Sequence, residues 1–232
     1  MKYLFLMLLI PATVFAKLSH ESEVSSVVTG GNSNVETYLF KTANQYEVKA
    51  MTYRVNGRYS YGEAGEEVSA REWDITLKIE RMFSESFAFY VAETVEGYRF
   101  QGIKARYNSD VGLKYYYVKS DTLNIFSEAG VRYTVEDQYG PEPTRYENKG
   151  RLYSEINDQP NKNFSYRLWL EYVPNFTNTD DYLVIHEASI TSILNSVFSL
   201  KFAFKGIYDD QPVVEGNKNY DYTYTTSLVA RF

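Results

Sequence analysis

The chain ends in "NYDYTYTTSLVARF", residues 219–232, and this stretch decides the fold class. Bulky apolar residues occupy every second position up to the terminal phenylalanine. One parity holds Tyr220, Tyr222, Tyr224, Leu228, Ala230 and Phe232, and the other holds Asp221, Thr223, Thr225, Ser227 and Arg231, with Thr226 and Val229 as exceptions. Because successive side chains of a strand point to opposite faces, the stretch predicts a strand with one apolar and one polar face. The apolar face looks either at a protein core or at lipid.

The same alternation recurs along the chain. In "FSYRLWLEYVPNF" (164–176), for example, Leu168 and Leu170 share one face while Arg167 and Glu171 share the other. No helical period longer than two turns is present after Glu21. The alternation predicts twelve strands, at 22–29, 35–47, 52–61, 72–83, 86–96, 103–118, 122–136, 145–157, 164–176, 182–194, 196–208 and 219–232.

The connections between these strands are rich in Gly, Pro, Asn and Asp, the residues that turns require. Longer connections such as "EDQYGPEPTR" (136–145) alternate with shorter ones such as "LNS" (194–196). An even number of strands of about ten residues, joined by alternating long and short connections, is typical of an outer-membrane barrel. The expected fold is therefore a single-domain, antiparallel up-and-down transmembrane β-barrel of about twelve strands, with both termini on the periplasmic side.

The first residues carry the features of a secretory signal peptide. A positively charged start, Met1–Lys2, precedes the apolar run "YLFLMLLI" (3–10) and the small-residue stretch "PATVFA". The run is too short to span a membrane as a helix, and it predicts cleavage after Ala16. The expected organisation is a cleaved signal peptide at 1–16 and a barrel at 17–232, exported to the outer membrane of a Gram-negative cell.

Composition narrows the class further. The chain has no cysteine, 23 Tyr and 14 Phe, and its formal net charge is −6. An acidic chain is an unsuitable partner for nucleic acid. The mean hydropathy of −0.41 excludes a helical membrane protein but not a barrel, because half of every barrel strand is polar.

Two observations favour lipid over a protein core for the apolar face. Aromatic residues crowd strand ends, as in "KYYYVK" (114–119), and Tyr and Trp favour the membrane–water boundary. A signal peptide combined with a final strand that ends the chain fits a barrel whose last strand removes the exposed sheet edge. The polar face then lines the lumen. The predicted lumen-lining side chains are Arg54, Arg58, Lys78, Glu80, Lys114, Glu128, Arg132, Arg167, Glu171, Lys201 and Arg231.

The terminal strand also resembles the C-terminal signal that the barrel-assembly machinery of bacteria recognises. In that signal a polar residue, a glycine and two aromatics recur at fixed spacing. Thr225 and Phe232 fit this pattern, whereas Ser227 replaces the usual glycine and Ala230 replaces an aromatic. Phe232 is therefore the predicted assembly signal.

Two longer stretches carry a family resemblance. "VVTGGNSNVETYLFKTANQYEVK" (27–49) has a Thr-Gly-Asn-rich hairpin before an alternating strand. Residues 70–137 contain a Phe-x-Gly-Ile segment and a later Glu-x-Gly-x-x-Tyr strand. These features resemble the YdiY-like family of salt-induced outer-membrane proteins, a domain of unknown function. The resemblance implies an outer-membrane barrel of about this strand number, and it brings no established substrate and no catalytic residues.

No cofactor, metal or catalytic site is predicted. The two histidines, His20 and His186, lie far apart in the sequence and there is no cysteine to complete a ligand set. Carboxylate pairs that hard cations prefer stand in the expected outward loops, but their spacing matches no defined calcium loop, so they are interpreted as solvated. These pairs are Glu66/Glu67, Asp180/Asp181 and Asp209/Asp210.

The spacing of histidine and serine along the strand argues against a hydrolase. Outer-membrane phospholipase A needs a His and a Ser two positions apart on one strand, but Ala188 stands two positions after His186. Ser189 is three positions away and points to the opposite face. An omptin-like peptidase would need Asp–His and Asp–Asp pairs at the rim, of which only the acidic part is present.

The expected function is non-enzymatic. A barrel of twelve strands is intermediate between small barrels filled by their own side chains and large barrels with an aqueous channel. The sequence therefore fits either a narrow channel for small solutes or a plugged structural barrel. The alternative is a surface-binding barrel whose acidic loops contact cations, lipopolysaccharide or a partner. Outer-membrane lipid and lipopolysaccharide are the expected surroundings, and the oligomeric state is left open.

Overall fold

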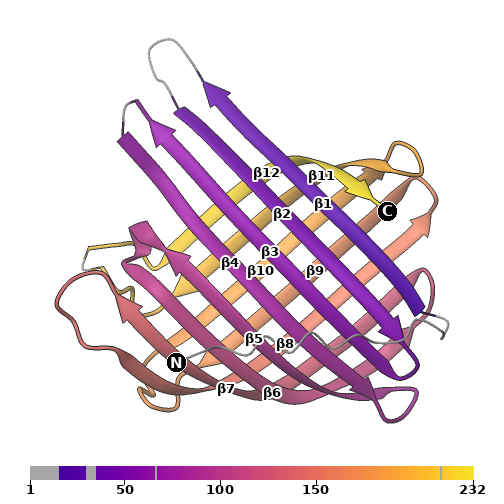
Figure 1. Ribbon diagram of the computed structural model, residues 1–232, viewed down its shortest axis with the longest axis horizontal. Helices are drawn as coiled ribbons and strands as arrows, with labels where there is room; N and C mark the ends of the chain where they lie inside the picture. The colour runs from indigo at the N-terminus through magenta and orange to yellow at the C-terminus, as the bar shows by residue number, and fades with distance from the viewer. Residues whose placement is uncertain (1–15, 30–34, 66, 215) are drawn as a thin grey trace, which may run out of the picture.

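The computed structural model describes residues 16–29, 35–65, 67–214 and 216–232, which form a closed barrel (Figure 1). Each strand pairs in antiparallel fashion with its neighbours in the sequence, and β1 pairs with β12. The twelve strands are β1 Ala16–Thr29, β2 Val35–Val48, β3 Met51–Ala64, β4 Glu67–Met82, β5 Phe87–Tyr98, β6 Ile103–Lys119, β7 Leu123–Gln138, β8 Arg145–Asn161, β9 Phe164–Pro174, β10 Tyr182–Ile193, β11 Phe198–Asp209 and β12 Tyr220–Arg231. The predicted fold class and strand number are confirmed.

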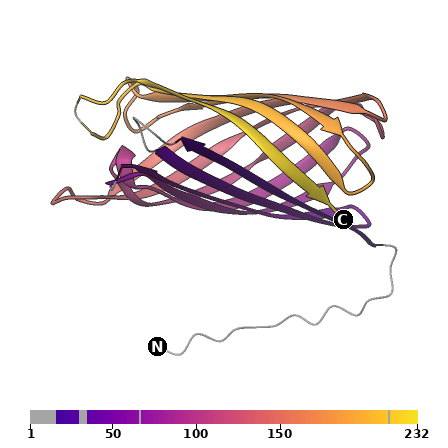
Figure 2. The same ribbon diagram turned by 90° about the horizontal axis from the view of Figure 1, so that it is seen from above.

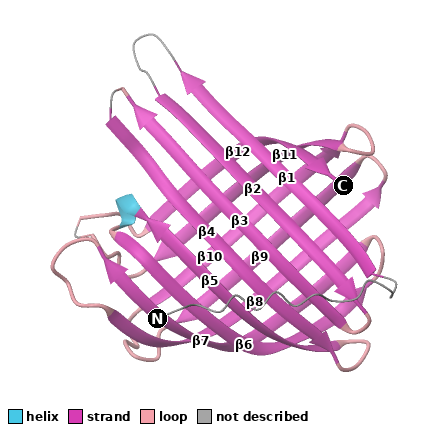
Figure 3. Cartoon of the chain, viewed as in Figure 1, coloured by secondary structure: helices cyan, strands magenta, loops and turns pink. Residues whose placement is uncertain are grey.

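Strands account for most of the described residues (Figure 3). The one helical element among the described residues is a 3-10 turn, η1 Arg99–Gln101, which ends at Gly102 with φ of 81°, a left-handed conformation that favours glycine. No helix in the described part of the chain is long and apolar enough to cross a membrane.

The connections follow the predicted alternation of length. At the end of the barrel that carries the C-terminus, the strands are joined by short turns such as residues 49–50 and 162–163. At the opposite end the connections are longer, with residues 139–144, 175–181 and 210–219 as the largest (Figure 2). We refer to these as the terminal end and the far end.

Burial in this barrel is the inverse of a soluble protein. The carboxylate-bearing Glu80 and the ammonium-bearing Lys114 are each 2% exposed, whereas Ile75 and Leu168 on the outer face are 56% and 45% exposed. Charged groups avoid full burial unless they are paired, and large apolar patches are rare on soluble monomers. The outer face is therefore the one that lipid covers, and the polar parity of each strand faces the lumen.

The first strand is longer than the sequence predicts. It was expected at 22–29, yet β1 begins at Ala16, because Ala16 pairs with Val48 and the ladder to β2 continues without a break to Thr29–Val35. Apolar and polar residues alternate only weakly in "AKLSHE" (16–21), so the sequence does not reveal this part of the strand. Its strand conformation comes from pairing with β2. Of the predicted signal peptide at 1–16, residues 1–15 lie outside the described residues, and only Ala16 is described.

The barrel closes where the last strand meets the first. Residues Glu21–Val24 pair with Leu228–Arg231. The Phe232 N–H donates to the His20 carbonyl at 2.9 Å, and the His20 N–H donates to the Phe232 carbonyl at 3.0 Å. The rings of Phe232 and His20 stack with centroids 6.1 Å apart. Val229, the apolar exception in the polar parity, points inward and is fully buried, as strict alternation requires. We call this junction the β1–β12 seam.

Deletion of Phe232 should impair insertion into the outer membrane more than it destabilises the folded barrel. The deletion removes one rung of two backbone hydrogen bonds, which contribute about 1–3 kcal/mol in total. Heat-modifiable gel migration in cell envelopes measures insertion, and urea unfolding of refolded protein measures stability. Phe232→Tyr, which keeps the ring, is the control. Normal insertion of the truncated chain would contradict an assembly role for Phe232.

Candidate functional site

The lumen contains two groups of ion pairs. The structure places all eleven of the predicted lumen-lining side chains in at least one ion pair each. The larger group fills the side of the lumen formed by β3–β9, and the smaller group bridges the β1–β12 seam. We describe them as the central network and the seam cluster.

Glu80 is one anchor of the central network. Its carboxylate accepts hydrogen bonds from Arg54 Nη1 at 2.8 Å, Lys114 Nζ at 3.1 Å and the Tyr116 hydroxyl at 2.9 Å. The ammonium of Lys114 also lies 3.7 Å from the centroid of the Phe126 ring, a cation–π contact. A carboxylate that is 2% exposed is stable here because two cations and a hydroxyl occupy its lone pairs.

Glu128 is the second anchor. Its carboxylate lies 2.7 Å from Arg151 Nη1 and 3.7 Å from Lys114 Nζ, and it also accepts a hydrogen bond from Lys78. Lys114 therefore joins Glu128 to Glu80, and the two anchors form one continuous network across β3, β4, β6, β7 and β8.

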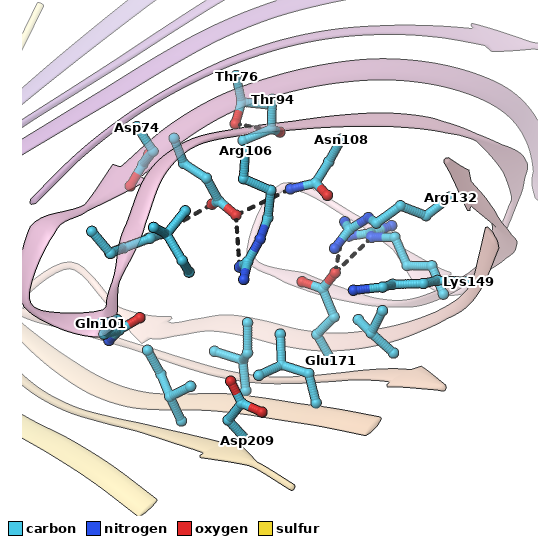
Figure 4. A pocket seen from close by; sticks show the side chains of 18 of the residues that line it. Asp74, Thr76, Thr94, Gln101, Arg106, Asn108, Arg132, Lys149, Glu171 and Asp209 are labelled. Atoms are coloured by element: carbon cyan, nitrogen blue, oxygen red, sulfur yellow. Dashed lines mark hydrogen bonds and ion pairs between the residues drawn. The ribbon is translucent and has the colours of Figure 1, made fainter. Parts of the chain in front are cut away.

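The central network continues toward the far end. Arg132 makes a bidentate pair with Asp110 at 2.6 and 2.8 Å, the geometry in which a guanidinium binds a carboxylate most strongly. Arg132 and Arg151 then share Glu171, at 3.0 and 2.9 Å (Figure 4). Charges of opposite sign thus alternate across the lumen and neutralise each other.

Tyr90 lies between the central network and the barrel wall. It is fully buried, and its hydroxyl accepts a hydrogen bond from Arg151 Nη1 at 3.1 Å. It lies over a glycine pair, Gly112–Gly130, where β6 and β7 are in register. A Cβ on Gly112 would meet the carbonyl oxygen of Ala129 at 2.5 Å and the Tyr90 hydroxyl at 2.7 Å. The glycines therefore make room for the ring against the wall.

The seam cluster is centred on Glu23. Its carboxylate lies 3.3 Å from Lys41 Nζ and 3.1 Å from Lys201 Nζ, and it accepts the Ser227 hydroxyl at 2.8 Å. Lys201 also lies 3.6 Å from Glu187. These contacts connect β1 and β2 to β10, β11 and β12, so that side chains support the seam as well as the backbone ladder.

Two more predicted residues lie toward the terminal mouth. Arg167 pairs with Glu155 at 2.7 Å, and Arg231 pairs with Glu21 at 2.6 Å. Their side chains are 39% and 43% exposed, so these pairs are hydrated and contribute little to stability.

Arg58 has an unused donor. Its Nε binds Asp74 at 2.6 Å and its Nη1 binds Glu72 at 2.9 Å. Its Nη2 is buried and has no hydrogen-bond partner among the described residues. Lys205, on the same polar parity, likewise makes no ion pair or hydrogen bond within the described part of the chain. These two cations have free capacity to bind a ligand, and the indole Nε1 of Trp169 is also buried without a partner among the described residues.

Two cavities extend into the lumen from opposite ends. One, of about 360 Å³, is lined at the far end by Gln101 and Pro212 (Figure 4). The other, of about 1110 Å³, reaches the terminal end. The two cavities share three lining side chains, Asn56, Asp74 and Lys205. We call these three residues the constriction.

Several lumen groups in the network are missing from the sequence-based prediction. They are Glu23, Tyr90, Asp110 and Arg151. Tyr90 had a usable signal, because it shares the parity of Ala88, Ala92 and Thr94 within "FAFYVAET" rather than that of the apolar residues. Its position against the Gly112–Gly130 pair depends on the register of β6 and β7, which the sequence does not reveal.

Among the described residues, those considered for chemistry do not assemble into a catalytic or metal-binding site, and Glu66 lies outside the described residues. His186 lies on the outer face, with Nε2 3.2 Å from the Tyr220 hydroxyl, whereas Ser189 is buried inside. Asp181 accepts the Asn175 amide at 2.8 Å, and Asp209 accepts the Gln211 amide at 3.0 Å. Within the described residues no three His, Cys, Asp or Glu side chains are placed to hold a metal ion.

Comparison with known proteins places the chain in a family. The profile of "Protein of unknown function, DUF481" matches residues 22–232. The chain belongs to this family. That assignment fits the resemblance to YdiY-like outer-membrane proteins seen in the sequence. A search of curated proteins gives no match.

Solved structures support the fold of this DUF481 protein. It is similar to the COG4313 outer membrane channel from Pseudomonas putida F1, with a TM-score of 0.56 and 9% identity over 96% of this chain and 97% of that one. It is also similar to the NanC porin, with a TM-score of 0.54 and 9% identity over 93% and 98% of the two chains. The shared feature is the outer-membrane, porin-like β-barrel.

Glu128→Gln should lower the free energy of unfolding by about 3 kcal/mol, because it leaves two lysines and an arginine beside a neutral group in a buried network. Glu21→Gln makes the same chemical change at an exposed pair and should cost less than about 1 kcal/mol. Urea unfolding in lipid vesicles, followed by tryptophan fluorescence, measures both. Equal losses in the two variants would contradict the stabilising role of the central network.

Gly112→Ala should also destabilise the barrel, by about 2 kcal/mol, because the new methyl group meets a backbone carbonyl that cannot move aside. Gly57→Ala is the matched control, since its Cβ would approach no atom closer than Thr42 Cγ2 at 3.4 Å. The same urea titration compares the two. A Gly112→Ala barrel as stable as the Gly57→Ala barrel would show that β6 and β7 do not approach this closely.

Proposed function

We propose that this DUF481 protein is a non-enzymatic outer-membrane channel that passes small solutes through a narrow constriction. The observation that carries the proposal is the pair of cavities entering from opposite ends and meeting at Asn56, Asp74 and Lys205. A lumen filled by side chains along its whole length would not leave a cavity at each mouth.

The central network sets the size limit in this proposal. It occupies the β3–β9 side of the lumen and is held in place by ion pairs between strands, so it does not move aside for a large solute. On the terminal side of the constriction the open path lies mainly along β10–β12 and β1–β3, and on the far side the central network itself lines the path. Because Asp74 is neutralised by Arg58 at 2.6 Å, the unpaired charge at the constriction is Lys205. Transport would be passive diffusion of small molecules.

The cellular setting completes the proposal. The barrel would be exported with its signal peptide removed after Ala16 and inserted by the barrel-assembly machinery, with the terminal end facing the periplasm. The porin-like fold of its structural neighbours supports the outer membrane as its location. Lipid and lipopolysaccharide would then surround the exposed apolar face.

A second candidate is a plugged structural barrel. The observation in its favour is the density of the central network, in which Glu80, Lys114 and Glu128 are all 2% exposed. If water does not pass the constriction, the two cavities are separate vestibules and the barrel conducts no ions.

Single-channel recording in planar bilayers separates the two candidates. Refolded protein should give discrete conductance steps, and Asn56→Trp should reduce the step size by at least about twofold, because it places a large ring in the constriction. Val55→Trp puts the same ring on the outer face of the same strand, where Val55 is 45% exposed, and should leave the steps unchanged. Absence of steps from folded wild-type protein would favour the plugged barrel.

A further inference from the structure

The β1–β12 seam is paired over less than half of its length. Its ladder runs only from Phe232–His20 to Leu228–Val24, whereas β11 and β12 pair continuously from Phe198–Ala230 to Tyr208–Tyr220. Beyond Val24, β1 stays paired with β2 on its other side, up to Thr29. Figures 1 and 2 show the far ends of β1 and β12 diverging while their other ends meet near the C-terminus. We call the unpaired part the seam opening.

The two edges of the seam opening present unpaired backbone groups. Phe232 bonds to His20 across the seam, so residues of the same parity in β12 direct their N–H and C=O groups toward β1. Above Leu228 these are Thr226, Tyr224 and Tyr222, and no partner for them is present on β1. In hydrocarbon each unsatisfied group costs several kcal/mol, so the edges need water or a polar ligand.

The opening lies within the lipid-facing wall. Its outer flanks carry Tyr222 and Tyr224, which are 63% and 72% exposed, and Val24 and Phe40, which are 55% and 47% exposed. From Phe232 to Tyr224 a strand advances about 26 Å, or roughly 20 Å along the barrel axis after tilt. The seam is therefore closed in the half of the apolar band nearer the terminal end and open in the half nearer the far end.

The larger lumen cavity extends to this opening. Most of its lining comes from inward-facing residues such as Ser25 and Thr225. Tyr224 also lines it, although Tyr224 belongs to the outward row with Phe204, whose ring lies 4.8 Å away. The lining by Ser25, Thr225 and Tyr224 brings the cavity to both edges of the seam opening.

Free hydrogen-bond donors stand just inside the opening. Lys205 is paired in register with Thr223, opposite the unpaired part of β12, and it has no partner among the described side chains. Arg58 lies two strands from β1, in register with Lys41, and its Nη2 is unsatisfied. Both line the larger cavity. A phosphate group has the acceptor oxygens that an ammonium and a guanidinium bind best.

We propose that the seam opening is a lateral portal that holds a membrane lipid with an anionic, phosphate-bearing headgroup. The headgroup enters the larger cavity and binds Lys205 and the free nitrogen of Arg58, while its polar atoms and accompanying water satisfy the unpaired edges of β1 and β12. The acyl chains remain in the bilayer against Tyr222, Tyr224 and Phe40. A second copy of the chain pairing its strand edge with the opening would satisfy the backbone groups but would leave Lys205 and Arg58 without a partner.

Native mass spectrometry of the detergent-purified barrel, after incubation with phosphatidylglycerol or phosphatidylethanolamine, tests the portal. One phosphatidylglycerol should be retained per barrel, with weaker retention of the zwitterionic lipid. Lys205→Gln should reduce retention about tenfold, the effect of losing one charge-assisted hydrogen bond. Inorganic phosphate should not compete at equal concentration, because it lacks the acyl chains.

A disulfide across the opening provides the geometric test, and the chain has no cysteine of its own to interfere. The double variant Ser26→Cys, Thr226→Cys places cysteines opposite each other if the register of the Val24–Leu228 pair is continued into the opening. Its disulfide would close the opening when oxidised. Ser22→Cys with Ala230→Cys is the matched control, because Ser22 and Ala230 are already paired on the outer face. Oxidation of the first pair should abolish lipid retention, and oxidation of the control pair should leave it intact.

Three results would overturn the portal. They are equal retention in the closed and control barrels, no preference for the anionic lipid, and dimers that form through the opening in place of lipid binding. Heat-modifiable migration confirms that each variant is folded. Channel conductance should persist in the closed barrel, since the disulfide lies outside the constriction. Loss of lipid with retained conductance therefore distinguishes the portal from the proposed channel.

Discussion

The structure depends on one constraint: every backbone N–H and C=O group within the lipid-facing wall needs a hydrogen-bond partner. Eleven antiparallel hairpin pairings satisfy the constraint between consecutive strands, and the β1–β12 seam completes the barrel. Among the described strands, the seam is the only pairing between strands far apart in the chain, and it is shorter than the others. The barrel is therefore held closed by the fewest backbone pairs where the first strand meets the last.

Because the apolar side chains of each strand face lipid, the charged side chains at the alternate positions face the lumen. There they need partners of opposite charge. The central network does so with alternating carboxylates and cations anchored at Glu80 and Glu128. Lys205 and one nitrogen of Arg58 are left without partners among the described residues. The proposed solute path and the proposed lipid portal both depend on these uneven charges of the lumen.

Much of the fold follows from local alternation. The segments "FSYRLWLEYV" and "SLKFAFKGIY" each show which residues face lipid, because a strand can point a side chain in only two directions. Turn residues at regular spacing give the number of strands for the same local reason. The length of β1 was underestimated because "AKLSHE" alternates weakly, and its strand conformation comes from pairing with β2. Tyr90 was missed because its place depends on a glycine pair contributed by two other strands.

By itself, the sequence determined the fold class and the strand count, since these depend on parity and turn chemistry within short segments. The tertiary structure alone decided which charges meet, where the two cavities share a constriction and how far the seam stays paired. Those features depend on the register between strands and on the tilt of the closed barrel, which combine residues as distant as Glu23 and Ser227. No local pattern fixes such a combination.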